Sequence, residues 1–246
     1  MYQARTYRYR LFDSTTAGSN PLVAFEVRVK ETDLFIKADR YLAQEAVTSV
    51  KAARALLEGY IRGHRLFATT LEPCAVDEDA PPIVADMARA AVRAGVGPMA
   101  AVAGAIAEHV GKDLLGLSAE VLVENGGDVF LKTRVPRRMG IYAGSSPLSG
   151  TLALKIAPQQ TPLGVCTSSG TVGHSLSFGC ADAAVILSSS AALADAAATA
   201  VANEIHGPED IPKGIERARA IEGVTGAAII VGDQLGAYGE VELERL

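Results

Sequence analysis

The stretch from Ala191 to Ala202 constrains the fold more than any other part of the chain, because it consists almost entirely of alanine, leucine and valine. A helix that is apolar on all sides is normally buried. With 246 residues, of which 49% are hydrophobic and 21% charged, the chain is long enough to bury such a helix in an ordinary globular core. We therefore expect this segment to form a close-packed interior helix.

Two polar side chains, Asp195 and Thr199, interrupt this apolar stretch and lie four residues apart. That spacing places them on one face of a helix. A buried carboxylate is costly unless it meets a cation, a metal or several hydrogen-bond donors. Carboxylate, hydroxyl and main-chain carbonyl oxygens are ligands that suit Mg²⁺ or Ca²⁺. Two interpretations stay open: a metal site, or a carboxylate that accepts hydrogen bonds from a neighbouring loop.

The first third of the chain predicts a hairpin followed by a long helix, within residues 1–70. Apolar and polar residues alternate over 23–36 with a turn near Glu31, which is typical of an antiparallel hairpin. Asp39 stands where a helix N-cap is expected, and apolar residues then recur every three or four positions until Gly63.

Together with the rest of the sequence, this predicts an α+β fold with antiparallel or mixed sheets flanked by helices. We expect a single domain over 1–246. Strands and helices are expected from period-two patterns, short apolar runs and helical periodicity. The expected strands are 121–123, 129–131, 141–142, 152–156, 183–187, 227–231 and 238–243, and the further helices are 83–94, 99–115, 191–205 and 208–220.

The charge and the cysteine content limit which binding partners and which cellular compartment are expected. The net charge is −5, from 23 basic and 28 acidic residues, so no broad basic face is expected and nucleic acid is not a predicted partner. Three cysteines without a CxxC pair argue against a disulfide framework and favour a cytoplasmic location. No signal peptide or membrane-spanning run is predicted. The apolar helix 99–110 leaves a homo-oligomer open, although core burial explains it equally well.

Two loops carry residues that could meet a ligand. The tetrad 125–128, Asn-Gly-Gly-Asp, is a hairpin-turn sequence, but paired glycines also let the backbone approach a bulky ligand. The loop 167–170, Thr-Ser-Ser-Gly, offers hydroxyls and N–H groups that can cradle a phosphate, or a polar connection that satisfies its own backbone. His174, close to this loop, is either a loop residue without a binding role or a ligand or base. Zinc spacing and a GxSxG elbow are both absent from the sequence.

In order and spacing, residues 122–128, 167–170 and 194–200 resemble the three C-terminal motifs of the ApbE superfamily, whose parent members are FAD:protein FMN transferases. The segment 100–104 is similar to the glycine-containing helix start of that family, so the resemblance covers about residues 98–246. The hairpin around 29–34 and the long helix behind it resemble the ApbE-like subgroup known as uncharacterised protein family 0280.

The resemblance implies binding of FAD and Mg²⁺. Asp195 and Thr199 would hold the metal, with a main-chain carbonyl from 100–103. No catalytic residue is assigned by it. The positions implied to face the flavin nucleotide are Asn125, Gly126, Gly127, Asp128, Thr167, Ser168, Ser169, Gly170 and His174. The sequence differs from the parent pattern at Ala103, where lysine is common, and after His174, where a His-Ile-Ile-Asp-Pro segment is absent.

Three functions follow from these observations. The subgroup resemblance implies a metal- and nucleotide-binding component linked to anaerobic, sulfide-dependent homocysteine formation. The parent family implies a Mg²⁺-dependent transferase that moves FMN from FAD onto a threonine of an acceptor protein and releases AMP. In the third, the loops only pack and bind nothing.

Overall fold

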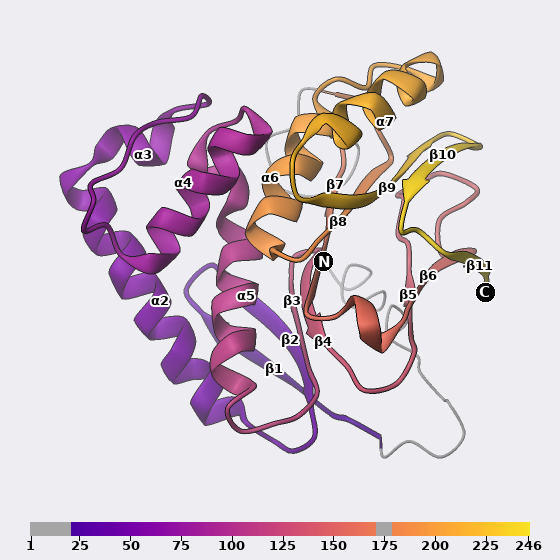
Figure 1. The fold of residues 1–246 in the computed structure, drawn as a ribbon. Coiled ribbons are helices and arrows are strands. Elements are labelled where there is room, and N and C mark those ends of the chain that lie inside the picture. The colour runs from indigo at the N-terminus through magenta and orange to yellow at the C-terminus, as the bar shows by residue number, and fades with distance from the viewer. Residues whose placement is uncertain (1–20, 171–178) are drawn as a thin grey trace.

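The computed structural model of the protein describes residues 21–170 and 179–246. An eight-stranded sheet forms its middle layer, with helices on one face and a three-stranded sheet on the other (Figure 1). All neighbouring strands are antiparallel. In spatial order the large sheet contains β1 (Val23–Val29), β2 (Thr32–Ala38), β3 (Val121–Asn125), β4 (Asp128–Lys132), β7 (Leu163–Ser168), β8 (Ala183–Ser188), β9 (Val224–Val231) and β10 (Gln234–Gly239). The small sheet contains β11 (Leu243–Arg245), β6 (Leu152–Ile156) and β5 (Arg137–Gly140).

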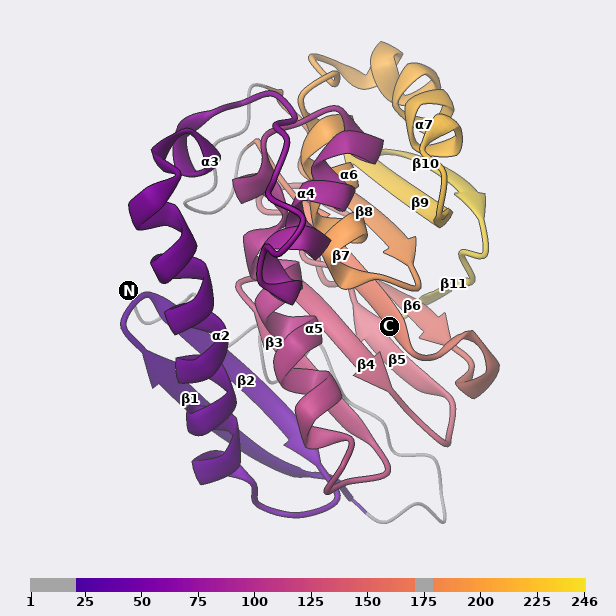
Figure 2. The same cartoon turned by 60° about the vertical axis from the view of Figure 1, so that its left-hand side comes forward.

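The helices gather on one side of the large sheet (Figure 2). They are α2 (Ala43–Gly63), α3 (Arg65–Thr69), α4 (Pro82–Ala94), α5 (Val102–Leu114), α6 (Ala191–Ala202) and α7 (Ile211–Ala220). The 3₁₀ turns η1 (Pro98–Ala101) and η3 (Pro208–Asp210) precede α5 and α7, and η2 (Pro158–Gln160) connects β6 to β7. No single described helix is long and apolar enough to cross a membrane; α4 and the η1–α5 segment pass that test only as a pair, and they are bent by 106°.

Two hydrophobic cores lie on the two faces of the large sheet, and the strand residues alternate between them. In β8, Ala184 and Ile186 join the core under the helices, whereas Val185 and Leu187 join the core under the small sheet. A strand buried on both faces has no polar positions, which explains its continuous apolar run.

The expectation that α6 is an interior helix is confirmed. Every residue of α6 except Asp195 and Thr199 is buried. Its first turn lies directly on β7, where Gly164 leaves room: a Cβ at that position would sit 2.3 Å from Cα of Ala191. The α+β class is confirmed as well, with antiparallel pairing in both sheets.

Several local predictions were wrong. Asp39 is not the N-cap of α2, because Leu42 stands at that position and Asp39 instead accepts N–H bonds from Ala119 (2.7 Å) and Glu120 (3.3 Å) at the entry to β3. The expected strand 141–142 lies just beyond the end of β5. The expected strand 238–243 divides into β10 and β11, which belong to different sheets, and Gly239, the last residue of β10, has a φ of 72°.

Substituting Gly164 by alanine should separate α6 from β7, because the new methyl group would meet the backbone of Ala191 and not a movable side chain. We expect a loss of about 1–3 kcal/mol in the free energy of unfolding, the usual cost of overpacking. Urea denaturation followed by circular dichroism measures it. Gly63→Ala is the matched control, because nothing lies within 4 Å of a Cβ there. Equal stability of the Gly164→Ala variant and the wild type would contradict the proposed close packing.

Candidate functional site

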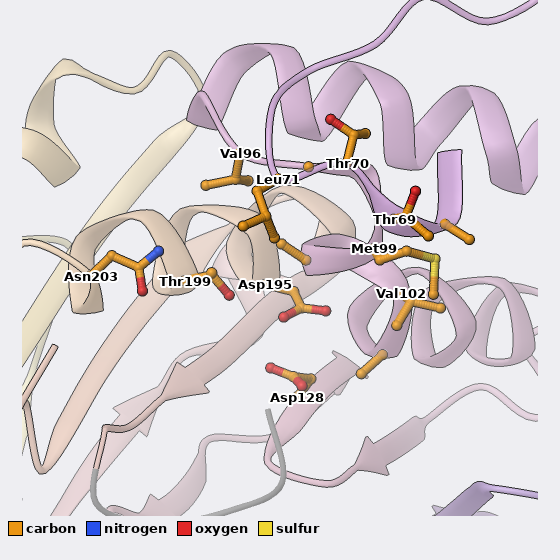
Figure 3. Close-up of a pocket in the computed structure, with 14 residues that line it drawn as sticks. Thr69, Thr70, Leu71, Val96, Met99, Val102, Asp128, Asp195, Thr199 and Asn203 are labelled. Carbon is orange, nitrogen blue, oxygen red and sulfur yellow. The ribbon is translucent and has the colours of Figure 1, made fainter. Parts of the chain in front are cut away.

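A cavity of about 340 Å³ lies where the N-terminal turn of α5, the middle of α6, the start of β4 and the chain that follows α3 meet (Figure 3). Most of its lining is apolar, with two carboxylates and three hydroxyl groups. The lining residues are Ala68, Thr69, Thr70, Leu71, Val96, Gly97, Met99, Ala100, Val102, Ala103, Asp128, Asp195, Thr199 and Asn203.

Asp195 is held by the N-terminus of α5. The Gly104 N–H donates to Asp195 Oδ2 at 2.8 Å, and the Ala103 N–H is also directed at this carboxylate. The first turn of any helix has N–H groups without partners inside the helix, and its dipole favours negative charge there. Glycine is required at 104, because a Cβ would lie 2.2 Å from the Ala191 carbonyl oxygen. The interpretation of Asp195 as a hydrogen-bond acceptor therefore describes part of its environment.

Asp128 enters the cavity from the β3–β4 hairpin. Gly126 and Gly127 form the two-residue turn with φ angles of 68° and 112°, both in the positive region that favours glycine. The turn pairs Asn125 with Asp128 across the hairpin. Asn125 Nδ2 donates to the Ala103 carbonyl oxygen at 3.1 Å, so the hairpin is joined to the start of α5.

The two carboxylates face each other in Figure 3, and protein surrounds both. Burial, with a smaller contribution from the charge of Glu124, raises the pKa of Asp128 to about 7, against hydrogen bonds from Cys166 and Thr167. Burial, followed by the charge of Asp128, raises the pKa of Asp195 well above its usual range, against the α5 amides. Asp195 keeps a partly open surface, and that surface faces the cavity.

The cavity lacks a compensating cation in the part of the chain that the structure describes. No lysine or arginine belongs to its described lining, and no ion pair there involves Asp128 or Asp195. Two carboxylates with the Thr199 hydroxyl nearby form a set of hard oxygen donors, and such sets suit Mg²⁺ or Ca²⁺. The residues present therefore fit a divalent cation, which would balance their charge.

The structure brings only some of the expected site residues together. Asp128, Asp195 and Thr199 line the cavity. Asn125 reaches its wall through the Ala103 carbonyl, whereas Gly126 and Gly127 shape the turn without lining the cavity.

The loop expected at 167–170 is partly strand. Thr167 and Ser168 end β7, and the Thr167 N–H reaches Asp128. Ser169 Oγ and the Gly170 N–H both donate to the Ala181 carbonyl oxygen, at 3.3 Å and 2.9 Å. None of the four lines the cavity, and His174 lies outside the described residues.

Sequence reasoning missed the outer wall of the cavity, formed by Thr69, Thr70 and Leu71. The sequence held one indication: Gly97, directly before Pro98, allows close approach of another chain segment. A Cβ at Gly97 would lie 2.0 Å from the Thr70 carbonyl oxygen. This wall therefore packs on the turn that begins η1.

Comparison with known proteins places the chain in a family. The family described as "AbpE bacteria" matches residues 14–234. A UPF0280 protein of Methanocella arvoryzae is 42% identical over 215 residues, covering 87% of each chain, and one of Methanocaldococcus jannaschii is 40% identical over 219 residues, covering 87% of this chain and 89% of the relative. The chain belongs to the UPF0280 family of ApbE-like proteins.

Solved structures agree with this UPF0280 protein in fold. The apo flavinyl transferase ApbE of Pseudomonas stutzeri aligns with a TM-score of 0.58 at 14% identity, over 89% of this chain and 94% of the other. The apbE protein of Thermotoga maritima aligns with a TM-score of 0.54 at 14% identity, over 87% and 96%. At such low identity the likeness shows the shared fold alone.

The paired carboxylates should make stability fall as the pH rises. Their raised folded-state pKa values mean that the folded protein binds protons more tightly than the unfolded chain, in which an aspartate titrates near pH 4. This contribution is present below that pH and is lost as the pH rises through about 7, the folded-state value of Asp128.

Asp128→Asn removes the cost of burying this charge and its repulsion of Asp195, so without divalent cations the variant should be more stable than the wild type at pH 8, by about 1–3 kcal/mol. The difference should shrink towards pH 4. Urea midpoints measured at pH 4, 6 and 8 test this, with Asp79→Asn in an exposed loop as the control. A difference that does not change with pH would contradict the assignment.

Proposed function

We propose that the chain binds a divalent cation, with Mg²⁺ as the first candidate, at Asp195, Asp128 and Thr199, and that this cation holds the diphosphate of a flavin nucleotide such as FAD. The observation that carries the proposal is that the buried Asp128 faces Asp195, whose open surface lies on the cavity, with no described lysine or arginine in the lining. Burying two like charges is unfavourable, so the arrangement suggests a ligand that brings positive charge.

The lining supports a nucleotide bound through a metal. A diphosphate is anionic and would be repelled by two carboxylates, and the described lining has no basic side chain to attract it. A divalent cation between them would reverse that repulsion, because Mg²⁺ in nucleotide sites commonly shares its ligands between carboxylates and phosphates. Leu71, Val96 and Met99 provide apolar surface for a planar ring.

The reaction we propose is transfer of FMN from FAD to an acceptor hydroxyl, which the motif resemblance supplies. The acceptor oxygen forms a bond to the phosphorus of the FMN half, the bond from that phosphorus to the AMP oxygen breaks, AMP keeps the electron pair, and the hydroxyl proton is lost to solvent or a base. The cation would neutralise charge that develops on the diphosphate. The chain's own contribution is orientation: the α5 amides fix Asp195, and Asn125 fixes the Ala103 carbonyl at the cavity wall.

Asp195→Asn and Thr199→Val should remove or weaken cation binding. In the wild type, Mg²⁺ with FAD should raise the melting temperature, because a ligand that binds only the folded state stabilises it by about 2.7 kcal/mol at a hundredfold excess over Kd. We expect no shift for Asp195→Asn and a smaller shift for Thr199→Val. Melting curves with and without Mg²⁺ and FAD measure this, and AMP release with flavin attached to an acceptor protein measures the reaction.

Glu216→Gln and Thr48→Val are matched controls, because both side chains are exposed on helices outside the cavity. They should shift as the wild type does. A wild type that shows no shift would support the hypothesis that the loops only pack. A shift without AMP release would keep the binding site and exclude the transferase.

A role in anaerobic, sulfide-dependent homocysteine formation stays a prediction from the subgroup resemblance. It is compatible with a metal- and nucleotide-binding component and needs no transfer activity. Deleting the gene should create a requirement for methionine or homocysteine during growth on sulfide. Unimpaired growth of the deletion strain would refute the role.

A further inference from the structure

Glu108 is a buried carboxylate between α5 and α6, and it lies outside the cavity. It is only 6% exposed. Its Oε2 accepts hydrogen bonds from Ser190 Oγ at 3.0 Å and from the Ala192 N–H at 3.2 Å, while its Oε1 pairs with Lys112 at 2.7 Å. Ser190 is the N-cap of α6. Glu108 therefore caps the N-terminus of α6 from the neighbouring helix.

The two helices cap each other. Asp195 of α6 accepts from Gly104 of α5, and Glu108 of α5 accepts from Ala192 of α6. The helices thus run antiparallel with their N-terminal turns side by side. Each carboxylate satisfies N–H groups that its partner helix cannot satisfy internally.

Packing brings α5 and α6 into close contact, because a Cβ at Gly104 would lie 2.2 Å from the Ala191 carbonyl oxygen. Helices resist sliding because the ridges of one fit the grooves of the other, and alanine side chains leave shallow ridges. Most of α6 is alanine, and Asp195 is its only charged residue. The hydrogen bonds from Ser190 and Ala192 to Glu108 add a directional restraint on where α6, and with it Asp195 and Thr199, lies.

We propose that Glu108 is a positioning residue for the cation site: by capping α6 it sets the placement of Asp195 and Thr199 at the cavity. The inference rests on the proposed cation-binding function. Glu108 does not line the cavity, so it would act only through α6. Groups that orient metal ligands without touching the metal commonly contribute about 10–100-fold to metal affinity.

The test compares Glu108→Ala with Glu108→Gln, using Mn²⁺ alone as the probe in the full chain. Glu108→Ala should weaken Mn²⁺ binding, measured by electron paramagnetic resonance, by about tenfold. Glu108→Gln keeps an acceptor oxygen for Ser190 and Ala192 and should restore most of the affinity. Lys112→Ala, which removes only an exposed ion-pair partner, should bind like the wild type.

A second measurement needs no metal. The Gly104 amide is bonded to Asp195 and not to Glu108, so its hydrogen exchange, followed by NMR, reports the placement of α6. Exchange at Gly104 should become faster in Glu108→Ala and return towards the wild-type rate in Glu108→Gln. A role confined to overall stability would raise exchange throughout the core, whereas positioning raises it first at Gly104.

The outcomes separate the two proposals. If the wild type does not bind Mn²⁺, the proposed function is wrong, and exchange at Gly104 alone decides the role of Glu108. If the wild type binds Mn²⁺ but Glu108→Ala matches it in affinity and exchange, the positioning role is overturned. If Glu108→Ala does not fold, Glu108→Asp replaces it, because its side chain is one methylene shorter and should not reach both Ser190 and Ala192. Mn²⁺ affinity and exchange at Gly104 then decide in the same way.

Discussion

The contact between the N-terminal turns of α5 and α6 is the constraint on which the site depends. Each turn exposes N–H groups that need acceptors, and each receives a carboxylate from the other helix: Asp195 for α5 and Glu108 for α6. Burying a carboxylate is costly. Here the helix dipoles and amides offset part of that cost, and they do so only while the two helices keep their present alignment.

This alignment requires small residues. Gly104 and Gly164 both approach Ala191, from α5 and from β7, at distances that leave no space for a methyl group. The alanine content of α6 follows from the same need, because a helix packed closely between other helices and a sheet needs small side chains on every face. The high alanine content of α6 is thus what allows Asp195 to lie next to α5.

The sequence predicted what depends on composition and period. The burial of α6, the β1–β2 hairpin and the need of Asp195 for a partner follow from residues near one another in the chain. What could not be predicted depends on tertiary neighbours. Asp39 has the side chain of an N-cap, but its carboxylate accepts the N–H of Ala119, which is 80 positions away in the chain. The cavity wall at Thr69 and Thr70 depends on Gly97, where a side chain would clash with the Thr70 carbonyl oxygen.

Asp195 also shows that the two interpretations of a buried carboxylate do not compete. A carboxylate has two oxygens and about four acceptor positions, so amides of α5 can orient Asp195 without using all of them. The side of Asp195 that remains open faces the cavity and Asp128. Helix capping then provides the rigid placement that a metal ligand needs, while the mutual repulsion of the two carboxylates makes a bound cation more favourable. The structural role of Asp195 is in this sense a condition for the proposed functional one.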